Sequence, residues 1–236
     1  QALDHVTRLV PQHKMGHAGT LDPMASGLLV VCVGKATRLI SYVQEMRKEY
    51  RASVRFGQRS STHDLEGTVE DARFAGQIDS AMLQRCLQKY CGEILQVPPQ
   101  HSAVHVAGRR AYELARSGQR VELDPRPVRI DRFVSSRFEY PEADFEIFCS
   151  SGTYVRSLVR DIGEDLGCGA VMTSLVRTAI GRFRIEEAVT LEQLTLQSFR
   201  MNLRPPQAAV QDLPPVTVSP HSHDDIRHGR PITTPV

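Results

Sequence analysis

The chain has 236 residues, of which 41% are hydrophobic, and a formal net charge of only +2 at pH 7. This length predicts one large domain, or one domain with a small second one, and a core large enough to hold a site rigidly. The small net charge excludes binding of nucleic acid through overall basicity, although local basic patches can still contact phosphates. The sequence shows no signal peptide and no apolar run of membrane-spanning length, so we expect a soluble, cytoplasmic protein.

Cysteine and histidine usage predicts neither disulfides nor a metal site. The cysteines are odd in number and lack Cys-x-x-Cys spacing, so we expect reduced thiols packed as small hydrophobic residues. They are Cys32, Cys86, Cys91, Cys149 and Cys168. The C-terminal histidines His221, His223 and His228, beside Asp224, lie in a Pro-rich stretch without a matching second pair of ligands.

Hydrophobic spacing and Gly or Pro punctuation predict the elements in chain order. Helices are predicted at residues 3–10, 36–46, 82–90, 111–117 and 155–166, and strands at 28–33, 50–56, 127–135, 144–149 and 170–185. Residues 57–71 are polar and predict a mobile surface loop. Thr153 is expected to cap the helix at 155, and Thr190 with Gln193 to form a capping box before a final short helix. Helices are interspersed irregularly among dominant strands, which favours an α+β fold with a mixed sheet.

The glycine-rich segment 16–27 contains a single carboxylate, Asp22. Its three glycines permit positive φ or close approach of another backbone, and Pro23 biases Asp22 toward extended or turn backbone. An acid held on a rigid loop suits a catalytic nucleophile or base. An ordinary Asx turn is the alternative interpretation of the loop alone.

A second polar group lies in residues 151–156, Ser-Gly-Thr-Tyr-Val-Arg, at the start of a predicted helix, where backbone N–H groups can bind an anion. If this turn faces the Asp22 loop, Arg156 could pair with the carboxylate, keep it ionised and fix its direction. Tyr50 and Tyr154 would then offer flat faces on which a base can stack. Taken singly, each tyrosine is more often a core residue and Arg156 a surface residue.

Three segments together carry a specific resemblance: Lys14-Met-Gly-His17-Ala-Gly-Thr-Leu-Asp22-Pro, Lys48-Glu-Tyr50 and Cys149-Ser-Ser-Gly-Thr-Tyr154-Val-Arg156-Ser-Leu. Lesser matches are Gly34-Lys-Ala-Thr-Arg-Leu39, Gln96-Val-Pro-Pro-Gln-His-Ser-Ala103 and Gly167-Cys-Gly-Ala170. In this order and spacing the chain resembles the TruB family of pseudouridine synthases over residues 1–200.

The resemblance implies the pseudouridine synthase fold, a mixed but largely antiparallel sheet with flanking helices. It implies that uridine 55 in the T-loop of tRNA is isomerised to pseudouridine by breaking the N-glycosidic bond and rejoining the base through C5. No cofactor and no metal are expected. The expected partner is tRNA, bound by a monomer with no obligatory protein partner.

The resemblance also implies residue roles. By match to the family's motifs, Asp22 is the catalytic aspartate and Arg156 the arginine paired with it. Tyr50 aligns with the tyrosine that stacks on the target base and is placed to assist removal of the C5 proton. Tyr154 and Leu175 align with residues that line the base pocket.

RNA contacts are expected of three further residues. His17 aligns with a histidine that packs against the RNA where the nucleotide is flipped out, and Arg51 and Arg55 are candidate phosphate contacts.

Three routes for Asp22 stay open: attack on the base, attack on the sugar, or abstraction of a sugar proton.

Departures from the family's pattern bear on domain organisation. A strand with a Lys-Pro-x-Gly motif, which would flank the active-site sheet, is absent, so we expect a truncated N-terminus. The Gly-His before Ala-Gly-Thr-Leu-Asp and the insertion at 57–67 favour the stand-alone bacterial type. We expect a catalytic domain at residues 1–203, a Pro-rich linker at 204–215, and the start of a PUA-like RNA-binding domain at 216–236.

Two other functions remain open. One is a tRNA-binding or tRNA-folding protein without turnover. The other is a nucleosidase, because the same C–N bond would be cleaved. A nucleosidase would normally call for a second carboxylate at suitable separation, and the sequence shows no second acid in a comparable loop.

Overall fold

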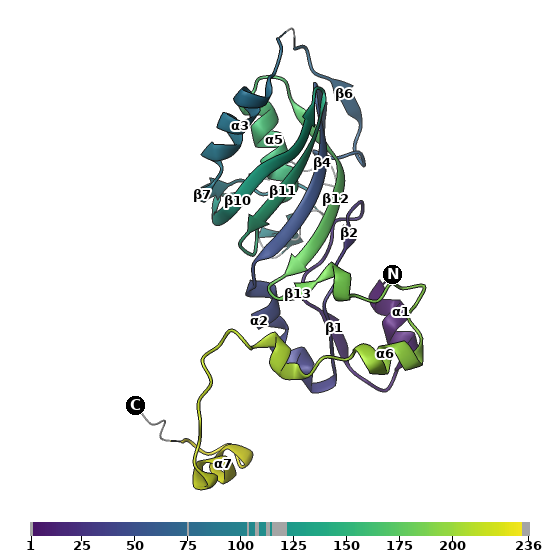
Figure 1. Ribbon diagram of the computed structural model, residues 1–236, viewed down its shortest axis with the longest axis vertical. Helices are drawn as coiled ribbons and strands as arrows, with labels where there is room; N and C mark the ends of the chain where they lie inside the picture. The colour runs from purple at the N-terminus through teal and green to yellow at the C-terminus, as the bar shows by residue number, and fades with distance from the viewer. Residues whose placement is uncertain are drawn as a thin grey trace.

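The computed structural model describes residues 2–232 except 75, 103, 107–108, 112–113 and 115–121. A twisted sheet forms its centre, with the strand order β13-β12-β4-β11-β10-β7 and β2 beside β12 (Figure 1). The strands are β2 (Ser26–Gly27), β4 (Lys48–Phe56), β7 (Gly92–Gln96), β10 (Arg126–Glu139), β11 (Glu142–Cys149), β12 (Ala170–Ile180) and β13 (Phe183–Arg184). Every pair is antiparallel except β12 with β2, which confirms the expected mixed, largely antiparallel sheet.

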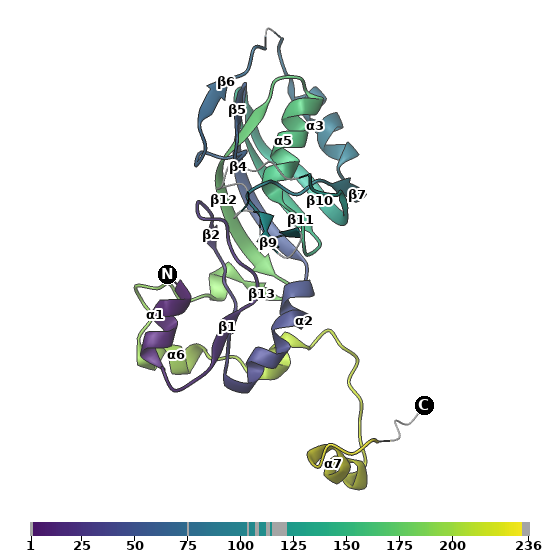
Figure 2. The same cartoon turned by 180° about the vertical axis from the view of Figure 1, so that it is seen from behind.

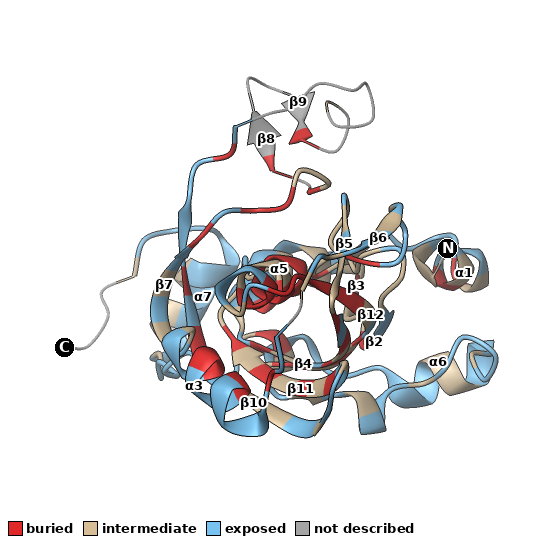
Figure 3. Cartoon of the chain, turned by 90° about the horizontal axis from the view of Figure 1, so that it is seen from above, coloured by how far each residue is buried: buried red, intermediate tan, exposed pale blue. Residues whose placement is uncertain are grey.

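Two helices cover one face of this sheet, α3 (Ser80–Lys89) and α5 (Val155–Asp165), and no helix from the described part of the chain lies on the opposite face (Figures 1 and 2). Helix α5 turns Val155, Leu158, Val159 and Ile162 toward the strands, at the spacing of one helical face. The main hydrophobic core therefore lies between these helices and the inward side chains of the strands, as the buried segments in Figure 3 show.

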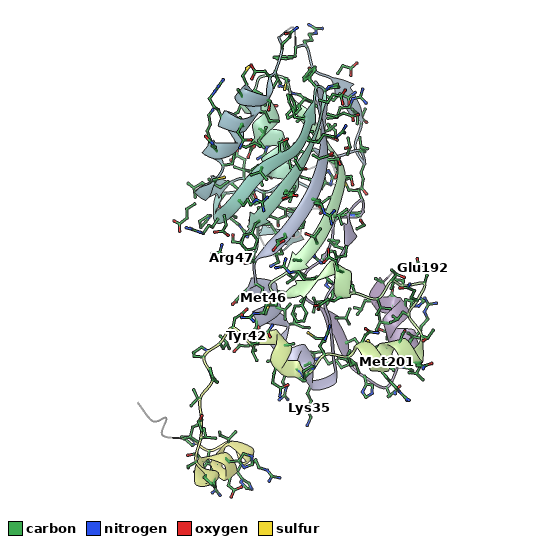
Figure 4. The ribbon with its side chains drawn as sticks, viewed as in Figure 1. Lys35, Tyr42, Met46, Arg47, Glu192 and Met201 are labelled. Atoms are coloured by element: carbon green, nitrogen blue, oxygen red, sulfur yellow. The ribbon has the colours of Figure 1, made fainter. Side chains whose placement is uncertain are left out.

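A smaller group of elements lies beyond one end of the sheet, around a second apolar cluster. It comprises α1 (Ala2–Leu9), β1 (Met15–His17), β3 (Val31–Val33), η1 (Gly34–Leu39), α2 (Ile40–Glu45), α6 (Leu196–Asn202) and η3 (Pro206–Ala209). Figure 4 places Met46 and Arg47 where α2 meets the sheet, and Met201 at the outer surface of α6. Met46 packs against this second cluster, which fixes the position of α2.

The remaining elements are the hairpin β5 (Gln58–Ser60) and β6 (Val69–Asp71), the pair β8 (His105–Val106) and β9 (Arg109–Arg110), η2 (Ile185–Glu187) and α7 (Pro220–Arg227). Helix α7 stands apart from the rest beyond an extended segment (Figure 1). Among the described residues, no helix combines the length and apolar character needed to cross a membrane.

Most predicted elements are confirmed, and four local predictions are wrong. The run at 28–33 forms a strand only over Val31–Val33, in a two-stranded sheet with β1. Residues 57–71 form the hairpin β5–β6 around a buried aspartate. The capping box predicted at Thr190 and Gln193 is not at a helix start. The last helix before the linker begins after Thr195, and its capping box is formed by Thr195 and Ser198.

The fourth correction concerns the start of α5. Tyr154 is the N-cap residue and makes no side-chain cap, while the Thr153 hydroxyl donates instead to the carbonyl of Ser150. The helix ends as expected at Gly167, whose φ of +72° is the left-handed conformation that suits glycine. The helix predicted at 111–117 falls mostly outside the described residues.

Candidate active site

Asp22 and Arg156, 134 residues apart, form a two-pronged ion pair. Arg156 donates from Nε to Oδ2 and from Nη2 to Oδ1 of Asp22, each over 2.8 Å. The arginine side chain is only 5% exposed, whereas that of Asp22 is 30% exposed. A planar guanidinium matches the two oxygens of a carboxylate, so this pairing fixes the orientation of the carboxylate as well as its position. The expected pairing is confirmed.

The loop that carries Asp22 connects β1 to β2. Ala25 donates to the carbonyl of Asp22 over 2.8 Å, which closes a turn with Pro23 and Met24 at its centre. At the end of the loop Gly27 has a φ of +103°, and a Cβ there would lie 2.3 Å from the carbonyl oxygen of Arg177. Only glycine allows the loop to approach β12 this closely.

Arg156 has further hydrogen-bond and ion-pair partners besides Asp22. Its Nη1 donates to the carbonyl of Thr62 over 3.3 Å, and its Nη2 to the carbonyl of His101 over 3.0 Å. The carboxylate of Asp64 lies 3.6 Å from Nη1 and is 1% exposed. The buried guanidinium is thus compensated by two carboxylates and two carbonyls, as a buried charge requires.

Asp64 is the second carboxylate that sequence reasoning did not find. It comes from the segment interpreted as a mobile loop, and its Oδ1 accepts from the Thr62 hydroxyl and the Glu66 amide. Its burial leaves no room for a substrate, so it holds Arg156 rather than supplying the partner acid of a nucleosidase. The serine and threonine hydroxyls at 60 and 62, which bond to this residue, are the signal that could have indicated an ordered turn.

Tyr50 lies on β4 and packs partly buried against the main core. Burial raises the pKa of its phenol to about 12, and the negative charge of Asp22 adds a small further rise. The hydroxyl is therefore neutral at neutral pH. A neutral phenol suits stacking on a base and donating a hydrogen bond better than it suits abstracting a proton.

Tyr154 is held by its backbone. The side-chain amide of Gln96 accepts from the Tyr154 amide over 2.8 Å and donates to the Tyr154 carbonyl over 3.1 Å. Gln96 is 2% exposed, so this pair satisfies a buried amide and fixes a residue two positions before Arg156. Burial raises the pKa of the Tyr154 phenol, and the charge of Asp22 adds to that rise.

Leu175 and His17 occupy different surroundings. Leu175 on β12 is buried in the main core, against which Tyr50 and Met24 also pack. His17 ends β1, five residues before Asp22, and its Nδ1 is buried with no hydrogen-bond partner in the described structure. Both lie on elements that border the Asp22 loop, and their contacts with RNA remain predictions.

Arg51 and Arg55 point away from the Asp22 side of the sheet. Both are exposed on β4, in alternation with the inward Ala52 and Val54, so they face the uncovered side. An RNA bound at Asp22 would have to pass around the sheet to reach them. The geometry therefore gives no support to these phosphate contacts.

The uncovered face is itself largely compensated in charge. A hollow of about 360 Å³ there includes Arg51 in its lining, and the other two arginines of the lining form ion pairs: Arg132 with Glu146 and Arg184 with Glu49. Alternating charges of this kind are typical of a solvated surface rather than of a phosphate-binding patch.

Two basic residues of the sheet, Lys48 and Arg177, are buried instead of exposed. Lys48 donates to the carbonyls of Gln44 and Met46, and burial lowers the pKa of its amine to about 8. Arg177 is 2% exposed. Arg177 lies two positions along β12 from each of the apolar residues 175 and 179, which face inward, so its burial could have been predicted from the sequence.

Four cysteines are buried as expected, but Cys91 is exposed.

Comparison with protein families gives two adjacent matches. Residues 7–155 match the N-terminal domain of the TruB family pseudouridylate synthases, and residues 156–211 match the C-terminal domain of tRNA pseudouridylate synthase B. The chain is 45% identical over 212 residues to tRNA pseudouridine synthase B of Thermobifida fusca, covering 86% of this chain and 72% of the relative. It is 38% identical over 244 residues to the protein of the same name from Vibrio parahaemolyticus, covering 98% and 77% respectively.

Solved structures agree in fold. A Cbf5–Nop10–Gar1 complex contains a chain that superposes with a TM-score of 0.75 at 27% identity, covering 96% of this chain and 62% of that one. An H/ACA RNP bound to a substrate RNA containing 2′-deoxyuridine gives a TM-score of 0.73 at 25% identity, with coverage of 98% and 62%. Both domain matches, the relatives and the superpositions agree, and the chain belongs to the TruB family of pseudouridylate synthases.

Proposed function

We propose that this chain isomerises uridine to pseudouridine in tRNA, at position 55 of the T-loop, with Asp22 as the catalytic residue. The observation that carries this proposal is the ion pair of Asp22 with Arg156. In it the buried guanidinium of Arg156 orients a carboxylate that is still 30% exposed. Binding alone requires no such arrangement. The tRNA pseudouridine synthases among its relatives support tRNA as the substrate.

The reaction balances without an added reagent. The bond between N1 of uracil and C1′ of ribose breaks, the base turns, and C5 bonds to C1′. The proton on C5 is then lost to water and N1 gains one. The carboxylate of Asp22, oriented by the cation of Arg156, is available as nucleophile or base for the first step.

The target nucleotide must leave its stack to reach Asp22. Unstacking a base costs a few kcal/mol, about 2–4, and stacking on an aromatic side chain returns about 1–3 kcal/mol. Tyr50, as a neutral phenol beside the core, is the residue proposed to receive the flipped base. Shape recognition of a folded stem-loop, as is usual for RNA, supplies the remaining binding energy.

Tritium release from tRNA labelled at C5 of uridine tests this function. The chain is expected to release label in proportion to product, and Asp22→Asn and Asp22→Ala to abolish release while tRNA binding stays within a few fold. Glu66→Gln, an exposed change near the site, is the matched control and should keep full release. A transcript with cytidine at position 55 should lose the release that depends on that position.

Each outcome has a distinct meaning. Wild-type turnover by Asp22→Ala would show that Asp22 is not catalytic. Tight tRNA binding by the unaltered chain without any release would favour the binding or folding role instead. Release that persists from the transcript with cytidine 55 would overturn the assignment of the position.

A further inference from the structure

Arg177 is a fully buried cation without an acidic partner. It lies on β12, is 2% exposed, and within the described part of the chain forms no ion pair with a carboxylate. This sets it apart from Arg156, which lies between Asp22 and Asp64. A guanidinium held in the interior by neutral groups alone needs several well-aligned hydrogen bonds.

The hydrogen bonds of Arg177 go to backbone carbonyls in the Asp22 loop and directly after β2. Arg177 donates from Nε to the carbonyl of Leu28 over 2.9 Å, from Nη2 to that of Gly19 over 3.1 Å, and from Nη1 to that of Thr20 over 3.5 Å. Gly19 and Thr20 precede Asp22 in the loop and Leu28 directly follows β2, so one side chain connects the segments on either side of Asp22.

The backbone of Arg177 adds to the same connection. Its carbonyl accepts from the Leu28 amide over 2.8 Å, and it pairs with Gly27 in the parallel contact of β12 with β2. The close approach at Gly27 leaves no space for a Cβ against this carbonyl. The loop is therefore fixed to β12 by both the main chain and the side chain of a single residue.

Arg177 also contacts the other proposed substrate-binding side chain. It is the cross-strand neighbour of Tyr50 in the antiparallel pairing of β12 with β4. The positive charge of Arg177 opposes the rise that burial causes in the pKa of Tyr50. Arg177 thus bonds to the backbone on either side of Asp22 and is the cross-strand neighbour of the tyrosine expected to receive the base.

We propose that Arg177 is a positioning residue that sets the distance and angle between Asp22 and Tyr50 for the reaction. Arg156 orients the carboxylate of Asp22, and Arg177 holds the backbone from which that carboxylate extends. Arginine is required because its planar fork donates in several fixed directions, whereas the ammonium of lysine is a compact point charge. This inference rests on the proposed function.

The test compares the full chain with its Arg177→Lys variant. In single-turnover tritium release, with the protein in saturating excess over tRNA, the rate should fall about a hundredfold, since a displacement of about 1 Å can cost that much. The dissociation constant for tRNA should stay within threefold. Leu83→Ala, on the buried side of α3, serves as a control at a temperature where both variants are folded. It should lower the melting temperature while keeping the rate within twofold.

Hydrogen exchange supplies a second measurement that a general loss of stability would not reproduce. The amides of Ala25 and Leu28 donate within the loop and to Arg177, and they should exchange at least tenfold faster in Arg177→Lys. Amides of β11 should keep their rates. If Arg177→Lys does not fold, Arg177→Gln, which keeps a shorter pair of donors, is measured by the same criteria.

The results separate this inference from the proposed function. An unaltered chain that releases no tritium contradicts the function, whatever the variants do. With an active chain, a wild-type rate in Arg177→Lys overturns the positioning role. So does a slow variant whose loop amides exchange normally, since Arg177 would then act otherwise than through the loop. Failure of both variants to fold would identify a core-stabilising residue and also overturn it.

Discussion

Arg156 donates two hydrogen bonds of 2.8 Å to the carboxylate of Asp22. The same guanidinium also donates to the carbonyls of Thr62 and His101. The carboxylate therefore has one favoured orientation, with its open side toward solvent. Both ends of this arrangement come from segments that are distant in sequence, and the sheet brings them together. The pair is consequently sensitive to the shape of the cation as well as to its charge.

Replacing Arg156 by lysine should preserve the charge and lose the fork. A hydrogen bond to a charged group contributes about 1.5–3 kcal/mol, so losing one aligned bond predicts a single-turnover rate roughly 10- to 100-fold lower. Arg160→Lys is the matched control and should keep its rate, because Arg160 lies one turn further along the same helix and donates to Asp161 and Val97, not to Asp22. Equal rates for Arg156→Lys and the unaltered chain would show that orientation of the carboxylate does not matter.

Asp64→Asn should weaken the site from behind. Asparagine can still accept from Thr62 and Glu66, but it removes the charge that faces Nη1 of Arg156. We expect a loss of about 1–3 kcal/mol in unfolding free energy, together with slower turnover. Urea unfolding and single-turnover assays measure the two effects. Asp71→Asn, on the exposed side of the same hairpin, should change neither, and an unaffected Asp64→Asn would assign Arg156 to Asp22 alone.

The part of the site that the sequence predicts is the part built from local patterns. Asp22 stands out because glycines and a proline surround it, and the alternation in β4 places Tyr50 and Arg51 on opposite faces. Asp64 and Gln96 could not be found in this way. Each is defined by a buried contact with a distant segment, Asp64 with Arg156 and Gln96 with Tyr154. From the local sequence alone, a polar residue at either position is predicted to lie in a loop or on the surface.

Gly27→Ala should damage the connection between the Asp22 loop and β12. Its φ of +103° disfavours a side chain, and the added Cβ would overlap the backbone of Arg177 at 2.3 Å. Backbone strain of about 1–2 kcal/mol and overpacking of about 1–3 kcal/mol add to a loss of roughly 2–5 kcal/mol. Gly34→Ala is the control, because its φ of +63° is also positive but no atom lies within 4 Å. It should lose only the strain, and equal melting temperatures for the two variants would contradict the close approach at Gly27.

We expect His63 to lower the stability of the folded state in mild acid. Burial, with the positive charges of Arg160 and Arg156, lowers the pKa of its imidazole from 6.5 to about 4, so the unfolded chain binds the proton first as the pH falls. The folded state should therefore lose on the order of 2 kcal/mol between about pH 6.5 and pH 4. His63→Asn suits the residue's positive φ of 65° and cannot titrate, so its unfolding midpoint in urea should fall less over this range. The exposed change His13→Asn should track the unaltered chain, and parallel acid curves for all three proteins would show that His63 is not the group responsible.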